Sequence, residues 1–263
     1  MTIAISTILL IVVLAFICEW IDSSIGMGYG TILSPLLIVM GFPVLAVVPA
    51  ILLSQAVGGL TASYFHHRYD NVKFSIQNGY MSEDVKTVLW ITGLGVFASI
   101  FASLVGIKID KTVLTTYIGS IVAVMGILIL CNFSFVYSSS KMAVVGIVSA
   151  FNKGLSGGGF GPSVTGGQMV LGNKEKNSIG VTTLAEGPIC IAGFLTYWYF
   201  KGIQDWNLVF ALLVGAVLAA PIGALTTKKT EKNLKKLVGV LLVVLGSLTL
   251  LKIYGIIDIP ISM

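Results

Sequence analysis

The sequence predicts an all-α polytopic membrane protein built from two inverted-topology repeats, and three observations support this prediction. Of the 263 residues, 56% are hydrophobic and 10% are charged, whereas soluble domains carry about a quarter charged residues. Apolar segments recur along the whole chain, and no polar stretch between them is long enough to fold by itself. A glycine-rich break between a long and a short segment also occurs twice. We therefore expect a single integral membrane domain with roughly 8–10 membrane segments.

The first half begins with an apolar helix at 2–24, and the chain then breaks at the glycines of 26–30. The next segment, 31–40, is too short to cross about 30 Å of hydrocarbon at about 1.5 Å per residue. It is therefore either a half-helix or half of a re-entrant hairpin. A third helix is expected at 43–65, and the polar loop 66–86 follows it.

The rest of the chain completes the first half and then repeats its order. The remaining segments are expected at 86–105, at 112–131, at 142–151, at 162–171, in a long helix ending at 200, at 206–226, and in a last helix ending at 254. Glycine costs about 1 kcal/mol in a helix interior, so the cluster GLSGGGFGP at 154–162 should end one helix. At bilayer depth, the helix that restarts after such a break points its positive N-terminal end inward, where it attracts anions.

A shift of 131 positions aligns the two breaks without a gap. Gly26, Gly28, Tyr29, Gly30 and Gly41 then fall on Gly157, Gly159, Phe160, Gly161 and Gly172. We interpret this as a duplication, with a first membrane repeat at 1–132 and a second at 141–263. Each repeat holds an odd number of apolar segments, so the second should enter the bilayer from the opposite side.

The distribution of positive charge predicts which side the termini face. With the N-terminus outside, the cytoplasmic loops carry Arg68, Lys73, Lys86, Lys141, Lys174, Lys176, Lys228, Lys229, Lys232, Lys235 and Lys236. The outer loops then carry only Lys108, Lys111, Lys201 and Lys252. Since cytoplasmic loops are rich in Lys and Arg, both termini are predicted to lie outside the plasma membrane. The net charge of +5 is thus a signal of topology, and no nucleic-acid partner is expected.

Lys153 stands immediately before the second set of glycines, between two apolar segments, and the 131-residue shift places Asp22 opposite it. A charge within a span costs about 2.5 kcal/mol or more unless it is paired or faces water. In a structural interpretation, Lys153 and Asp22 form an ion pair that joins the repeats. In a functional interpretation, Lys153 faces a cavity and neutralises an anionic substrate. The two interpretations do not exclude each other.

Glu186 lies in the middle of a long apolar helix, and the shift places Gln55 opposite it. Burial favours the protonated form of a carboxyl group, which is the property that a proton-coupling residue needs. Glu186 and Asp22 are therefore the candidate proton-coupling residues. Alternatively, Glu186 is a structural carboxyl group satisfied by Thr182, Thr183 or backbone amides.

The candidate substrate-binding residues cluster at the two breaks, where amides, hydroxyl groups and one lysine can hydrogen-bond an oxyanion. They are Lys153, Gly157, Gly158, Gly159, Phe160, Gly161, Ser163, Thr165, Gln168, Gly28, Tyr29, Gly30 and Gln55. Small polar residues are also common at helix contacts in any membrane protein, so packing is the alternative for the hydroxyl and amide side chains.

Several other polar residues receive a structural interpretation. Glu19 is expected near a membrane face, where water solvates it, and His66 and His67 are expected as a solvated cluster in a cytoplasmic loop. The cysteines are interpreted as small packing residues, because their spacing fits no metal site: Cys18, Cys131 and Cys190. No metal or cofactor is expected.

Two long stretches give the chain a resemblance to a known family. They are IGMGYGTILSPLLIVMGFP at 25–43 and LSGGGFGPSVTGGQMVLGNKEKNSIGVTTLAEG at 155–187. With these motifs, nearly the whole chain resembles the TauE/SafE sulfite exporter family of membrane permeases. The resemblance implies movement of sulfite, of sulfonates such as sulfoacetate, or of other small sulfur-containing anions across the plasma membrane, mostly outward. Met27 and Tyr29 make the first motif less glycine-rich than the family pattern.

These observations predict a secondary transporter, and not an enzyme, that exports a small sulfur-containing anion in a proton-coupled cycle. Lys153 and the amides of Gly157 to Gly161 would hold the anion, and Glu186 would exchange the proton. A passive small-anion channel and a permease for another small organic anion are the alternatives. An intramembrane enzyme is disfavoured because the spans contain no His-Asp, Cys-His or metal-ligand constellation. The oligomeric state is left open, with a homodimer as the candidate.

Overall fold

The computed structural model describes residues 4–77, 80–131, 139–227 and 232–257, and this part of the chain is almost entirely helical. Its helices are α1 (Ile5–Ile25), α2 (Tyr29–Val39), α3 (Val44–Arg68), α4 (Glu83–Lys108), α5 (Lys111–Leu130), α6 (Ser139–Ser156), α7 (Phe160–Val170), α8 (Glu175–Lys201), α9 (Trp206–Thr226) and α10 (Lys232–Ile253). The strands β1 (Ile76–Gln77) and β2 (Tyr80–Met81) pair antiparallel in the polar loop after α3.

Seven of the described helices are long and apolar enough to cross a membrane, namely α1, α3, α4, α5, α8, α9 and the Lys235–Ile253 part of α10. The apolar helix α2 and the Met142–Ser156 part of α6 are shorter, and α7 has only 11 residues. The predicted class, an all-α multi-pass membrane protein, is confirmed. The two short segments predicted at 31–40 and 162–171 are the helices α2 and α7.

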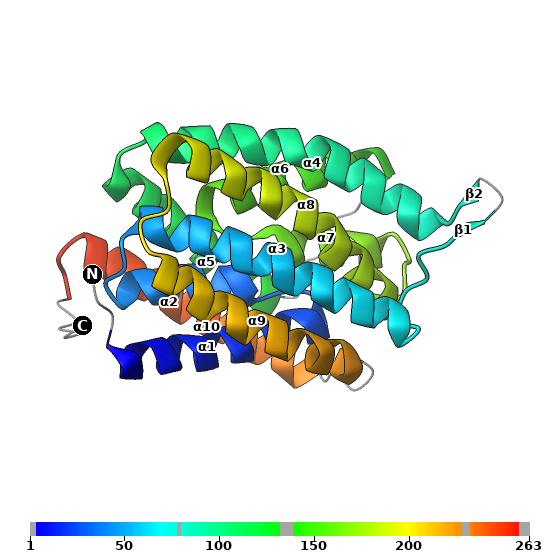
Figure 1. Cartoon of the computed structure of the whole chain (residues 1–263), viewed down its shortest axis with the longest axis horizontal. Coiled ribbons are helices and arrows are strands. Elements are labelled where there is room, and N and C mark those ends of the chain that lie inside the picture. Colours follow the sequence, from blue (N-terminus) through cyan, green and yellow to red (C-terminus); the bar gives the residue numbers. More distant parts are fainter. Residues whose placement is uncertain (1–3, 78–79, 132–138, 228–231, 258–263) are drawn as a thin grey trace.

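The long helices lie side by side along one direction (Figure 1). The first turn of α1 and the last turn of α10 lie at one end of this bundle, and the β1–β2 pair lies at the other end. If the bundle crosses a bilayer along its helices, the described parts of the chain begin and end on the same side. Lys228 and Lys229, which we counted as cytoplasmic, and the boundary between the proposed repeats at 132–138 lie outside the described residues.

The order and the packing of the helices repeat between the two halves. Helices α2 and α7 begin 131 residues apart, and so do α3 and α8. Helices α1 and α3 of the first half pack on α9 of the second half. In the same way, helices α6 and α8 of the second half pack on α4 of the first half. The equivalent helices α3 and α8 contact each other and run antiparallel, since Gly59 faces Thr183 and His66 faces Gly180. This arrangement is the one expected of inverted repeats, whose orientation in a membrane stays a prediction.

Small residues let these helices approach closely. A Cβ atom added at Gly215 of α9 would lie 2.4 Å from the carbonyl oxygen of Val12 in α1. One added at Gly126 of α5 would lie 2.7 Å from the backbone nitrogen of Val243 in α10. Close approach of this kind is how helices associate where lipid removes the hydrophobic driving force. The polar residues described next are therefore enclosed by tightly packed helices.

Candidate functional site

The site lies where the two glycine breaks cross in the interior of the bundle. Each break ends one helix with a glycine in the left-handed region, Gly26 at φ 75° and Gly157 at φ 77°, a backbone conformation that L side chains rarely adopt. Each break also starts a short helix, α2 after Gly28 and α7 after Gly159. The N-terminal ends of both short helices, with their partial positive charge, therefore lie in the interior.

The two breaks are packed against each other through their backbones. A Cβ atom added at Gly30 would lie 1.7 Å from the carbonyl oxygen of Gly157, and one added at Gly161 would lie 2.5 Å from that of Gly26. Under the 131-residue shift, Gly30 corresponds to Gly161 and Gly26 to Gly157, so the two contacts are equivalent. Only glycine fits at Gly30 and Gly161 in this arrangement.

Hydroxyl groups join the two breaks as well. The Thr31 hydroxyl oxygen accepts a hydrogen bond from the Gly159 amide at 3.1 Å. The Ser34 hydroxyl donates to the Ser156 carbonyl at 2.6 Å, and the Thr165 hydroxyl donates to the Gly26 carbonyl at 3.2 Å. The crossing is thus held by hydrogen bonds from both halves of the chain.

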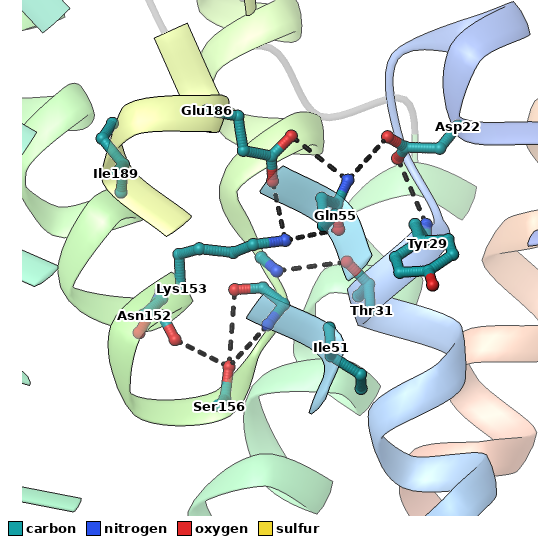
Figure 2. Close-up of polar contacts among 12 residues, drawn as sticks. Asp22, Tyr29, Thr31, Ile51, Gln55, Asn152, Lys153, Ser156, Glu186 and Ile189 are labelled. Carbon is teal, nitrogen blue, oxygen red and sulfur yellow. Dashed lines mark hydrogen bonds and ion pairs between the residues drawn. The ribbon is translucent and has the colours of Figure 1, made fainter. Parts of the chain in front are cut away.

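Beside the crossing lies a network of one lysine, one glutamine and two carboxyl groups, all buried (Figure 2). Lys153 Nζ lies 2.7 Å from Glu186 Oε1 in an ion pair whose side chains are 2% and 4% exposed. Lys153 Nζ also donates to Gln55 Oε1 at 2.6 Å. Gln55 Nε2 in turn donates to Asp22 Oδ2 at 3.0 Å and to Glu186 Oε2 at 3.3 Å. The amide of Gln55 therefore connects every charged group of the network.

Asp22 also accepts a hydrogen bond at its Oδ1 atom from the backbone amide of Tyr29, the first residue of α2, at 3.2 Å. The first half thus supplies its own carboxylate to the N-terminus of its short helix. In the second half, the first residue of the short helix is Phe160, its N-cap residue Gly159 has no side chain that could cap α7, and the position equivalent to Asp22 is Lys153. The second half therefore has a lysine where the first half has the carboxylate, and the ammonium group of this lysine lies 3.1 Å from a Cβ atom added at Gly30, in the first turn of α2.

The structure corrects two predictions about this network. Lys153 forms its ion pair with Glu186 and not with Asp22. Gln55 hydrogen-bonds both Lys153 and Asp22 and so connects them. The alternative for Glu186 is also wrong in its partners, because Thr183 donates to its own helix and Thr182 accepts from α7 side chains. The 131-residue shift pairs equivalent positions of the sequence, and it does not require the residues at those positions to contact each other. Each meets the partner that the crossing helices bring to it.

The predicted anion-binding amides are only partly available. The Gly157 amide donates to the Lys153 carbonyl at 2.8 Å, the Gly158 amide donates to the Ser156 hydroxyl, and the Gly159 amide donates to Thr31. The amides of Phe160 and Gly161, at the start of α7, donate no hydrogen bond to a side chain of the N-cap residue, because Gly159 has no side chain. Any anion at this break is therefore expected at the α7 N-terminus rather than along the whole glycine run.

Other predicted binding residues form hydrogen bonds with groups other than Lys153. Thr165 and Gln168 both hydrogen-bond Thr182 and so join α7 to α8. The Ser163 hydroxyl donates to the Gly159 carbonyl. The Tyr29 hydroxyl donates to the Ser54 hydroxyl at 2.8 Å, so only the backbone amide of Tyr29 belongs to the network. These are contacts of the kind that packing, the alternative considered for such residues, predicts, and their part in binding stays a prediction.

Two residues that we expected to be solvated are buried. Glu19 is 0% exposed on α1, where Ser23 donates to its Oε1 atom at 2.7 Å. His66 is 0% exposed in the last turn of α3, with Asn71 at 3.1 Å from its Nδ1 atom, whereas His67 is exposed. The spacing of Glu19 and Asp22, three apart and so on one face of α1, was the available signal for Glu19.

Residues 10–249 match the family described as Sulfite exporter TauE/SafE. The chain belongs to this family of membrane transporters. It is 25% identical over 261 residues to the probable membrane transporter protein YtnM of Bacillus subtilis (strain 168), in a match that covers 92% of this chain and 83% of that protein. It is 24% identical over 241 residues to the probable membrane transporter protein YdhB of the same organism, covering 87% and 94%. No solved structure matches the chain.

Proposed function

We propose that this TauE/SafE transporter is a secondary, proton-coupled exporter of a small sulfur-containing anion, sulfite or an organosulfonate such as sulfoacetate, in the plasma membrane. The observation that carries the proposal is the buried ammonium group of Lys153 at the crossing of the two breaks, 3.1 Å from a Cβ atom added at Gly30 in the first turn of α2. The printed name of the family supports the substrate class. In this proposal both termini lie outside the membrane, and the two inverted repeats comprise 1–132 and 141–263.

Lys153 and the amides of Phe160 and Gly161 together suit an oxyanion. A sulfonate or sulfite offers three acceptor oxygens and a negative charge, and charge-assisted hydrogen bonds from an ammonium group and helix N-terminal amides are strong. In the structure Lys153 is occupied by Glu186 and Gln55. An arriving anion would therefore replace Glu186 as the partner of Lys153.

This exchange of partners gives a mechanism for coupling to protons. When Lys153 turns to the anion, the Glu186 carboxylate would remain buried without its counter-charge, which is strongly unfavourable. Protonation of Glu186 removes that charge, so the anion and a proton bind together and move outward together, driven by the anion's own gradient. The Gln55 amide can follow the change, because it already hydrogen-bonds both residues. Rocking of the two repeats about this point would then expose the site to either side.

Binding of sulfite, sulfoacetate, sulfate, thiosulfate and acetate to the purified protein tests the anion site. At 100 times its dissociation constant, a ligand of the folded protein adds about 2.7 kcal/mol of stability, which a thermal-shift assay detects. We expect one sulfur anion to stabilise the wild type but not Lys153→Met. The control is Lys235→Met, which breaks an ion pair with Glu175 at the surface. Stabilisation of Lys153→Met equal to that of the wild type would contradict the site.

Proteoliposomes test the coupling. Anion flux in the wild type should respond to an imposed proton gradient and lose that response in Glu186→Gln. Flux that persists unchanged in Glu186→Gln and after collapse of the proton gradient would instead identify a passive channel. Stabilisation and flux with acetate alone would identify a permease for another organic anion.

A further inference from the structure

Glu19 is a buried carboxyl group that the proposed transport mechanism does not use. It lies one turn before Asp22 on α1 and is 0% exposed. Ser23 donates to its Oε1 atom, but its Oε2 atom is buried without a hydrogen-bond partner. An ionised carboxylate with an unpaired oxygen in a dry interior is costly, whereas the neutral acid is far less so.

The surroundings of Glu19 are small and apolar. A Cβ atom added at Gly58 of α3 would lie 3.4 Å from Glu19 Oε2 and 2.9 Å from the Cβ atom of Ala216 in α9. The carboxyl group is therefore clamped where α1, α3 and α9 meet. Helix α9 packs along both α1 and α3, whereas α1 and α3 meet each other only locally, so the clamp opens when α1 separates from α9.

The second half of the chain fills the equivalent space without a carboxyl group. The 131-residue shift places Ala150 at the position of Glu19 and Ile189 at that of Gly58. Ala150 and Ile189 lie against Gly95 of α4, at 3.2 and 2.5 Å from a Cβ atom added there. The alanine and the isoleucine of the second half thus fill the space that the glutamate and the glycine fill in the first half. Packing alone does not require an acid at Glu19.

The charged and titratable groups around Glu19 come from several helices. Asp22 and Cys18 lie on α1 itself, Tyr29 on α2, Lys153 on α6 and Glu186 on α8. Helix α9 carries no titratable side chain, and those of α3 lie toward its end, at Tyr64, His66, His67 and Arg68. The nearby buried charged groups on the other described helices are therefore Lys153 and Glu186, and these two are already paired with each other.

We propose that Glu19 is a positioning residue of the transport cycle, which must carry a proton for α1 to close on α3 and α9. In the closed arrangement the proton stays on the carboxyl group. When α1 separates and water enters, Glu19 releases the proton to that water, and it must regain one before the helices close again. The inference deepens the proposed function, because closing of α1 completes the site at Asp22 and Gln55. It requires no particular substrate.

The native Cys18 beside Glu19 reports the opening, because it is 3% exposed and becomes reachable when α1 separates. In a background with Cys131→Ser and Cys190→Ser, a small thiol reagent is applied to the protein without substrate over a pH series. One proton separates the open and closed states, so the labelling rate of the wild type should rise by up to about tenfold per pH unit relative to Glu19→Gln at the same pH. The comparison at equal pH removes the pH dependence of the thiol itself.

A second variant keeps the test valid if Glu19→Gln folds poorly. Glu19→Ala with Gly58→Ile and Ala216→Gly copies the apolar arrangement of the second half, and we expect it to stay closed and unlabelled at every pH. Glu83→Gln, at an exposed carboxyl group on α4, should behave like the wild type. Parallel pH dependence in the wild type and in both Glu19 variants would overturn the inference. The anion-binding assay fails or succeeds independently of this result, so the two proposals can be told apart.

Discussion

Lys153 and Glu186 depend on each other for their stability in the bundle interior. Their side chains are 2% and 4% exposed, and each hydrogen-bonds Gln55. Removing one partner of such a pair leaves a buried charge, which costs about 3–5 kcal/mol, whereas replacing both partners by apolar residues is close to neutral. The pair therefore contributes little net stability, although losing half of it is harmful. That balance suits a pair that exchanges partners during transport.

We predict that Lys153→Met lowers the free energy of unfolding by about 3–5 kcal/mol and that adding Glu186→Met restores most of it. Unfolding in detergent, followed by circular dichroism, measures both. The control is Lys235→Met, whose pair with Glu175 has side chains 28% and 38% exposed and should contribute about 1 kcal/mol or less. A double variant as unstable as Lys153→Met alone would mean that the lysine acts through its packing and not through its charge.

The sequence predicted the residues of the buried network more successfully than it predicted which of them contact each other. Lys153 and Glu186 were predicted because charges inside apolar segments are costly, and the 131-residue shift led from them to Asp22 and Gln55. All four residues are in the network. Their partners depend on how α6 and α8 cross α3, which residue spacing does not encode. Glu19 was misjudged because its place near the end of an apolar run suggested water, whereas helices distant in the sequence cover it.

The short helices α2 and α7 depend on glycine at their crossing. We predict that Gly30→Ala destabilises the protein by about 3 kcal/mol or prevents folding, because its Cβ atom would lie 1.7 Å from the Gly157 carbonyl oxygen. Gly166→Ala in the equivalent helix α7 is the control, since nothing lies within 4 Å of a Cβ atom there. That variant should gain about 0.5–1 kcal/mol from helix propensity. Thermal unfolding of both variants checks this, and equal effects would show that the breaks do not touch.

The existence of the helical elements followed from the sequence, but their contacts did not. Both short segments were found within two residues of their predicted bounds, because glycine and chain length limit where they can lie. The direct contact of the two breaks joins Gly30 to Gly157, and no local pattern predicts a contact over that separation. For the same reason α3 was predicted to end at 65, whereas α3 continues to Arg68 with His66 covered by other elements.

For the whole molecule, inverted repeats predict that the turns after α2 and after α7 face opposite sides of the membrane. Pro43 follows α2, Asn173 follows α7, and both are exposed, whereas Phe42 is buried. In a variant without native cysteines, Pro43→Cys should react with a membrane-impermeant thiol reagent applied to intact cells. Asn173→Cys should react only in inside-out vesicles. Reaction of both from the same side would exclude the inverted arrangement, and the reverse pattern would place the termini in the cytoplasm.

The pairing of α1 with α9 has a consequence for how the protein is made. Helix α1 leaves the ribosome first, yet the helix that covers its polar face begins only at Trp206. Until then, Asp22 can already meet its partners Tyr29 and Gln55, but Glu19 lacks the side of its enclosure that Ala216 of α9 provides. The first half of the chain must therefore enter the membrane with Glu19 protonated or in contact with water.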